Sequence, residues 1–242
     1  MDRSLYIAAN AATLALRGQA ANSNNLANAS TVGFRAEMLA SEAMPLSETR
    51  QYSVLRPVGV SHADGPVQHT GDPLHVAMQG DHYLTVLGPD GQPAYTRAGD
   101  LRLNANGQLV TGSGHPVMGA NGPIAVPPHE HVAIGADGTV SVVPQGAADG
   151  TMVQLDRLAV VTVAPEDLQR SENGLLGVRA GAEALPAAGN VLATGSVEGA
   201  NVNAAESLVR MIELSRQFEL NVNLMKTIDE NAAAGSRLVR RG

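Results

Sequence analysis

The sequence predicts an α+β protein in which coiled-coil-like helices at the two ends of the chain pair around an inserted, mainly β, antiparallel domain. Two observations favour this class. Near both ends, apolar or small residues recur at alternating spacings of three and four, as in a heptad seam. Between these ladders, short strand-like runs alternate with dipeptides typical of tight turns. We therefore expect a helical assembly domain from residues 1–34 and 200–242 and a β-rich body at residues 72–179.

The C-terminal ladder predicts a long helix that begins after Asn203, whose side chain suits a helix cap. Its seam combines polar positions with the apolar residues Met211, Leu214, Phe218, Met225 and Ile228. Other apolar residues lie off the seam, namely Leu208, Val209, Ile212, Leu220, Val222 and Leu224. A helix that is apolar on more than one face is usually enclosed by several neighbours. An ordinary core helix of a globular protein is the alternative.

The N-terminal ladder has the same spacing and consists of Leu5, Ala9, Ala12, Leu16, Gln19, Ser23 and Leu26. It contains no apolar run longer than Leu5 to Ala9. A secretory signal needs about seven or more consecutive apolar residues, and a membrane helix needs about twenty. We therefore expect no cleavable signal peptide and no direct membrane insertion.

Two connectors and a series of hairpins are expected between the helices. Residues 35–71, with Pro45, Pro57 and Pro66, predict an extended connector, and residues 180–199 a return connector. The expected strands lie at residues 83–87, 101–103, 108–110, 132–134, 139–143 and 158–163. Turns are expected at Asp90-Gly91, Asn106-Gly107, Asn121-Gly122, Asp137-Gly138 and Asp149-Gly150. Repeated strands and turns at this spacing indicate a sandwich-like or barrel-like sheet domain.

The composition argues against several classes of function. A formal charge of −7 disfavours nucleic-acid binding, and the absence of cysteine excludes thiolate chemistry. His129 and His131 share one face of an expected strand, but no further ligand completes a metal site. The adjacent Glu166 and Asp167 suit the start of a short helix. We expect no catalytic, cofactor or metal site and no small-molecule substrate, and hence no enzyme.

Several motifs carry a family resemblance. Asn24-Asn25-Leu26-Ala27-Asn28 is followed by Thr31-x-Gly33-Phe34-Arg35, and later stretches continue in the same order: Thr70-Gly-Asp-Pro-Leu74, Tyr95-Thr-Arg-Ala-Gly99, Gly195-Ser-Val-Glu-Gly-Ala-Asn-Val202 and Arg216-Gln-Phe-Glu219. Together they resemble the flagellar rod and hook proteins over nearly the whole chain. The chain departs from the family pattern at Asp81-His-Tyr-Leu84, which has one aromatic residue, and at Ala200, where the family has serine.

The resemblance implies a structural subunit of the proximal rod of the flagellar basal body, an axial drive shaft across the periplasm. It implies assembly with copies of itself and adjoining rod subunits, and export through the flagellar type III apparatus. A distal rod or hook-type subunit is one alternative. Two others come from different classes: a ligand-binding β domain on a dimerising helical stalk, and a hydrolase that uses a His–carboxylate pair without a recognisable motif. The assembly-interface candidates are Leu5, Ala9, Ala12, Leu16, Asn25, Leu26, Asn28, Gly33, Phe34, Met211, Leu214, Phe218, Met225 and Ile228.

Overall fold

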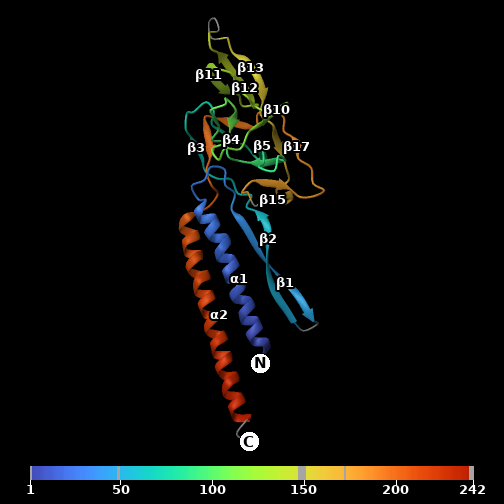
Figure 1. Ribbon diagram of the computed structural model, residues 1–242, viewed down its shortest axis with the longest axis vertical. Helices are drawn as coiled ribbons and strands as arrows, with labels where there is room; N and C mark the ends of the chain where they lie inside the picture. Colours follow the sequence, from blue (N-terminus) through green and yellow to red (C-terminus); the bar gives the residue numbers. More distant parts are fainter. Residues whose placement is uncertain (1, 48–49, 147–150, 172, 240–242) are drawn as a thin grey trace. The chain divides into compact units, whose positions relative to one another are not determined.

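The computed structural model describes residues 2–47, 50–146, 151–171 and 173–239, and side chains within them except those at positions 2–3, 41–58 and 235–239. The chain divides into two compact units (Figure 1). Unit 1 comprises Met1–Asn28, Glu37–Val58 and Val202–Gly242, and unit 2 comprises Ala29–Ala36 and Gly59–Asn201. Over the described residues, two α-helices and a mainly antiparallel set of strands confirm the α+β class.

Unit 1 contains the two long helices, α1 (Asp2–Ala27) and α2 (Ala204–Val239), which run antiparallel side by side (Figure 1). The Asn203 side chain accepts hydrogen bonds from the N–H groups of Ala205 (3.0 Å) and Glu206 (3.3 Å), which confirms the predicted cap. At 1.5 Å per residue, α2 is about 54 Å long. Its length exceeds that of α1 by 10 residues, 36 against 26.

A two-stranded ribbon, β1 (Glu37–Ser47) with β2 (Arg50–Val60), occupies most of the segment for which we expected an extended connector. The prolines of this segment suggested an unpaired chain. In a two-stranded ribbon, however, each strand has one unpaired edge, where the missing N–H of a proline removes no ladder hydrogen bond. The prolines are therefore compatible with long strands here.

Unit 2 is built around a six-stranded sheet whose registered pairs are all antiparallel. Its strands, in spatial order, are β15 (Leu168–Arg170), β16 (Leu176–Val178), β6 (Pro93–Thr96), β5 (His82–Leu87), β14 (Val160–Thr162) and β17 (Leu185–Pro186). Leu84 in the central strand β5 pairs with Thr96 on one side and Val160 on the other. Glu166 and Asp167 lie in the short helix η2 (Pro165–Asp167), as their position predicted.

The other strands of unit 2 form smaller sheets rather than one continuous sandwich or barrel. A three-stranded sheet contains β11 (His129–Ile134), β12 (Thr139–Pro144) and β13 (Val153–Arg157). Two-stranded ladders pair β3 (Val67–His69) with β19 (Ser196–Glu198), β4 (Val76–Met78) with β18 (Leu192–Thr194), β7 (Arg102–Leu103) with β8 (Leu109–Val110), and β9 (Met118–Gly119) with β10 (Gly122–Pro123). Strands β17, β18 and β19 thus replace the expected return connector.

Four of the five predicted turns join paired strands: three lie between them, and Asn121-Gly122 overlaps the first residue of β10. Gly91, Gly107, Gly122 and Gly138 all have positive φ, which glycine adopts without a steric penalty. The fifth, Asp149-Gly150, lies outside the described residues. The strands enclose an aliphatic core around Leu84, Val86 and Leu109, and a smaller one that packs Tyr83 against Val60 and Leu168.

Candidate assembly surface

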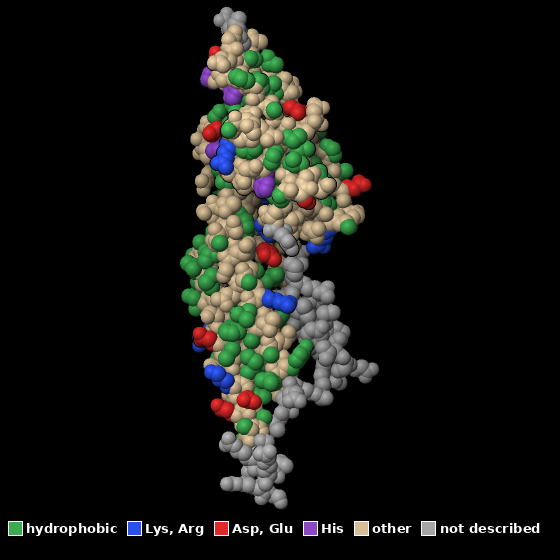
Figure 2. All heavy atoms as spheres, viewed as in Figure 1, with side chains coloured by type: hydrophobic (Ala, Val, Ile, Leu, Met, Phe, Trp, Pro, Cys, Tyr) green, Lys and Arg blue, Asp and Glu red, His purple; other side chains and the backbone are tan. Residues whose placement is uncertain are grey.

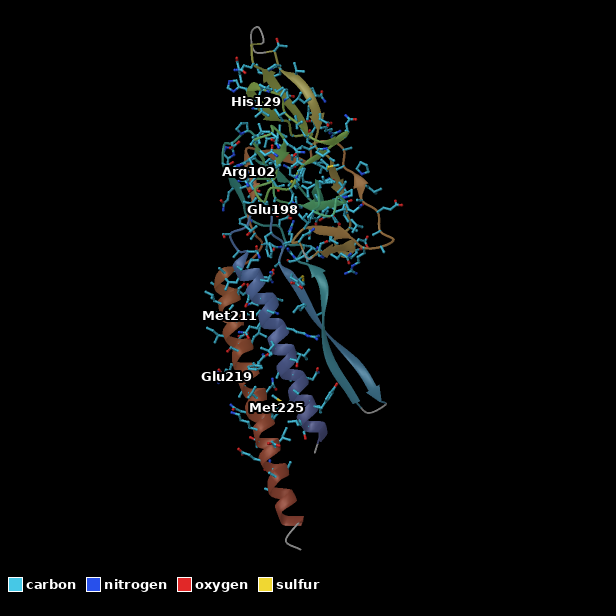
Figure 3. The ribbon with its side chains drawn as sticks, in the orientation of Figure 1. Arg102, His129, Glu198, Met211, Glu219 and Met225 are labelled. Atoms are coloured by element: carbon cyan, nitrogen blue, oxygen red, sulfur yellow. The ribbon has the colours of Figure 1, made fainter. Side chains whose placement is uncertain are left out.

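The half-buried face of α2 coincides with the seam predicted from the sequence. Ser207 is buried, and Met211, Leu214, Phe218, Asn221, Met225, Ile228 and Ala232 are all partly buried, each three or four residues after the last. Figure 3 shows two of them, Met211 and Met225, along the helix. The heptad spacing therefore identified correctly which side of α2 is covered.

The covered side of α1 agrees with the predicted ladder in part: Ala12 is buried, and Ala9, Gln19, Ser23 and Leu26 are partly buried. Its buried residues are Ala8, Ala12, Ala15 and Asn22, whereas Leu5 and Leu16 are exposed. Small residues here match the larger side chains of α2, because a Cβ added at Gly18 would meet Leu214 Cδ2 at 3.1 Å. Neighbouring stripes of α1 have the same three-and-four spacing, so periodicity alone did not separate them.

Two asparagines of the N-terminal segment fix the geometry of unit 1. The buried Asn22 side chain donates a hydrogen bond to the Ser207 carbonyl of α2 at 2.7 Å. The amide of Asn25 donates to the Glu37 carbonyl (3.0 Å), and its oxygen accepts from the Glu37 N–H (2.8 Å). Asn25 therefore holds the start of β1 at the end of α1.

The opposite side of α2 carries apolar side chains that the rest of the chain leaves exposed. Ile212 is 69% exposed and Leu220 60%, and Leu208, Val209 and Leu224 are also exposed. At 3.6 residues per turn, these five positions lie about 90° or more around the helix from the seam. Near its start, α1 adds the exposed Tyr6 and Ile7. Figure 2 shows hydrophobic side chains at the surface along α2. We call the five α2 residues the outer apolar face.

Unit 2 contains a buried group of charges, which we call the charge cluster: Arg35, Asp64, Arg97 and Glu198. Arg97 Nε donates to Glu198 Oε2 at 2.6 Å, and Arg35 Nη2 lies 3.3 Å from Glu198 Oε1. These three side chains are at most 3% exposed, whereas Asp64, which contacts both arginines, is 65% exposed. Glu198 (Figure 3) is thus the buried carboxylate that the two buried guanidinium groups share, and Asp64 supplies the second negative charge.

Backbone groups satisfy further polar atoms of this cluster, although the buried Arg35 Nε has no hydrogen-bond partner among the described residues. Arg97 donates to the carbonyls of Met78 (3.1 Å) and His82 (3.2 Å), and the Gly65 N–H donates to Glu198 Oε1 at 2.9 Å. Arg97 also lies over the Tyr83 ring, 5.6 Å from its centroid. Burial raises the pKa of the Tyr83 hydroxyl, and the charges of Arg35 and Arg97 oppose that shift. Hydrogen bonds and paired charges of this kind are what make buried charges tolerable.

The Gly33-Phe34-Arg35 segment lies inside the same junction of unit 2. The Gly33 N–H donates to the Glu198 carbonyl at 2.7 Å, and Gly33 has φ +66°. A Cβ there would overlap the backbone of Arg97 and Ala98. Phe34 is buried beneath the Arg170 guanidinium, 4.4 Å from the ring centroid. Gly33 and Phe34 therefore serve contacts within the chain, and their part in assembly remains a prediction.

The remaining candidates for chemistry do not converge. His129 and His131 lie in β11 with a register shift between them, and His129 Nδ1 donates to the Pro127 carbonyl at 2.9 Å. Over the described residues, no three His, Cys, Asp or Glu side chains are grouped as metal ligands. No helix among them is both long enough and apolar enough to span a membrane.

Sequence reasoning missed the charge cluster. Arg35, Arg97 and Glu198 each lie within a motif that we quoted, but nothing in their spacing assigned them a common role. The usable signal was weak: each is a charged residue next to a small or aromatic one, in a segment without amphipathic periodicity. Residues 35, 97 and 198 meet only because of the tertiary fold.

The fold and this surface define a class: a protein with a β-rich unit and paired terminal helices that carry an exposed apolar face. Residues 77–142 match the family model of the flagellar hook protein FlgE/F/G D1 domain, and residues 193–238 that of the flagellar basal body rod FlgEFG protein C-terminal region. The chain is 38% identical to the flagellar basal-body rod protein FlgF of Salmonella typhimurium and 37% identical to that of Escherichia coli. Both matches cover 99% of each chain.

A flagellar basal-body rod protein FlgG, from Buchnera aphidicola subsp. Schizaphis graminum, is 32% identical over 86% of this chain and 88% of its own. The chain belongs to the FlgF family of flagellar basal-body rod proteins. This family is structural rather than enzymatic.

Proposed function

We propose that this rod subunit polymerises through its terminal helices, which pair as a coiled coil, into the axial drive shaft of the proximal rod. The observation that carries the proposal is the outer apolar face. Large apolar side chains at 60–69% exposure, such as Ile212 and Leu220, are costly in water when they lie together along one helix. Neighbouring subunits that cover them would recover this cost.

The arrangement favours a polymer over a closed dimer. The seam of α2 already faces α1 of the same chain, so the outer apolar face is free for a different contact. A contact between two different surface patches, repeated without closing, generates a helical filament. Copies of this chain and adjoining rod subunits are the partners that we propose, and the flagellar type III apparatus the export route.

The assembly candidates from the sequence separate into two groups. Leu5 and Leu16 are exposed, so they are placed to contact a neighbour. The partly or fully buried positions, such as Ala12 and Phe218, are placed to hold α1 on α2. We propose that unit 1 forms the assembly core, and that the β-rich body forms lateral contacts within the basal body. In this proposal the chain needs no cofactor, metal, nucleic acid or small-molecule substrate.

The experiment that tests the proposal replaces Ile212 with glutamate. Ile212 is 69% exposed, so its loss should change the free energy of unfolding by no more than about 0.5 kcal/mol. In the rod, the same carboxylate would be buried without a partner, which is prohibitive. We expect a folded variant by circular dichroism that is absent from purified basal bodies and leaves cells non-motile.

A matched control is Gln92→Glu, which adds the same charge at an exposed position in the turn between β5 and β6 of unit 2, outside the terminal helices. Cells that express only this variant should swim normally. Incorporation of Ile212→Glu into basal bodies at the level of the unmodified chain would refute the proposal that the outer apolar face mediates assembly.

A further inference from the structure

The segment Leu192–Asn201, which we call the closing segment, contacts parts of unit 2 that are far earlier in the chain. Its strands β18 and β19 pair with β4 and β3, respectively. All three residues of β19 are buried, and Leu192 belongs to the main aliphatic core. Without this segment, β3 and β4 would have no registered strand partner among the described residues. The core would also have an open side there.

Glu198 gives the closing segment an electrostatic role as well. It supplies the buried carboxylate for Arg35 and Arg97, which precede it by 163 and 101 residues. Before Glu198 is in place, the acidic partner left to both arginines within the charge cluster is the solvent-exposed Asp64. Exposed pairs contribute little free energy, whereas a buried, unpaired charge costs several kcal/mol. The arginines therefore oppose burial until Glu198 joins them.

Asn201 closes the same junction through the backbone. Its side-chain oxygen accepts from the Ala36 N–H at 2.7 Å, and its amide donates to the carbonyls of Ala63 (2.8 Å) and Ser61 (3.3 Å). Its own N–H donates to the Phe34 carbonyl at 3.2 Å. Asn201 thus satisfies four backbone groups, which come from residues 34–36 and from residues 61–63.

We propose that the closing segment is a folding latch: unit 2 stays open and sensitive to protease until residues 192–201 are available to it. Two contributions to the free energy oppose folding: the burial of two guanidinium groups and the loss of entropy on closing long loops. Neither contribution is compensated until residues 192–201 add their contacts. The latch delays stable folding until most of the chain has been made. This inference concerns the folding of the chain itself and stands independently of the export route proposed above.

The direct test is synchronised cell-free synthesis of the full chain, with a brief protease pulse at successive times. We expect that fragments containing β5 and β14 resist the protease only in chains whose residues 192–201 have emerged from the ribosome. Resistant fragments from shorter nascent chains would overturn the proposal. This measurement uses the unmodified sequence, so it does not depend on whether any variant folds.

A second test locates the cause in the charge of Glu198, by hydrogen exchange of the purified full chain. Glu198→Gln keeps the shape of the side chain but leaves two buried arginines without their carboxylate. We expect exchange in β5 and β14 to accelerate at least about a hundredfold, together with that of residues 195–201. Glu183→Gln, the same change at an exposed position, should leave exchange unaltered. Acceleration confined to residues 195–201, with β5 and β14 still protected, would overturn the proposal.

Discussion

Gly33 offers a test of how closely two backbone segments of unit 2 approach each other. Replacing Gly33 with alanine introduces a Cβ in a residue with φ +66°, where the added atom would overlap the backbone of Arg97 and Ala98. To accommodate it, the segment would have to move away from Arg97. This shift would also break the 2.7 Å hydrogen bond from Gly33 N–H to the Glu198 carbonyl.

The magnitude follows from three contributions. A left-handed conformation costs alanine about 1–2 kcal/mol, and the reduced freedom of the unfolded chain offsets about 0.4–1 kcal/mol of this. Loss of a buried hydrogen bond with its partner left unsatisfied adds about 1–3 kcal/mol. The free energy of unfolding of unit 2 should therefore fall by about 3 kcal/mol.

Gly71→Ala is the matched control, because Gly71 has φ +76° but no atom within 4 Å of an added Cβ. This variant should lose only about 1 kcal/mol, the net cost of the backbone conformation. The assay is urea unfolding, monitored by the hydrogen-exchange protection of the β5 amides. These amides report the unfolding of unit 2 separately from that of the helices. Equal losses in the two variants would refute the argument that close approach, rather than φ, requires glycine at position 33.

Two further predictions concern titration and metal binding. Because burial raises the pKa of Tyr83, the unfolded chain loses this proton first as the pH rises above about 10, so the free energy of unfolding should fall there. Tyr83→Phe should flatten that decline, whereas Tyr6→Phe, at an exposed position, should not. If the free energy of unfolding depended on alkaline pH in the same way in both variants, the decline could not be assigned to the Tyr83 hydroxyl. Replacing His129 and His131 with alanine should change the free energy of unfolding by no more than about 0.5 kcal/mol; a large loss of melting temperature that a chelator reproduces in the unmodified protein would indicate a structural metal.

Much of the helical part and of the turn pattern was predictable because the signals are local. The seam of α2 follows from a spacing of three and four residues, which places Met211, Leu214 and Phe218 on one side of any helix. The cap at Asn203 and the turn glycines likewise depend on neighbouring residues alone. Such features are encoded within one or two turns of chain, so no tertiary information is needed to find them.

Most of the features that the sequence left open depend on partners distant along the chain. Which stripe of α1 is covered depends on the size of the facing side chains, and small residues such as Ala8 and Gly18 fit against α2 where Leu5 and Leu16 do not. The ribbon β1–β2 needed a partner strand before its prolines became compatible with pairing. The charge cluster is the clearest case. Positions 35, 97 and 198 carry charged residues, but nothing in their neighbouring sequence indicates that they meet. The fold brings them together because each guanidinium group, once buried, needs a carboxylate partner, and Glu198 supplies it from more than 100 residues further along the chain.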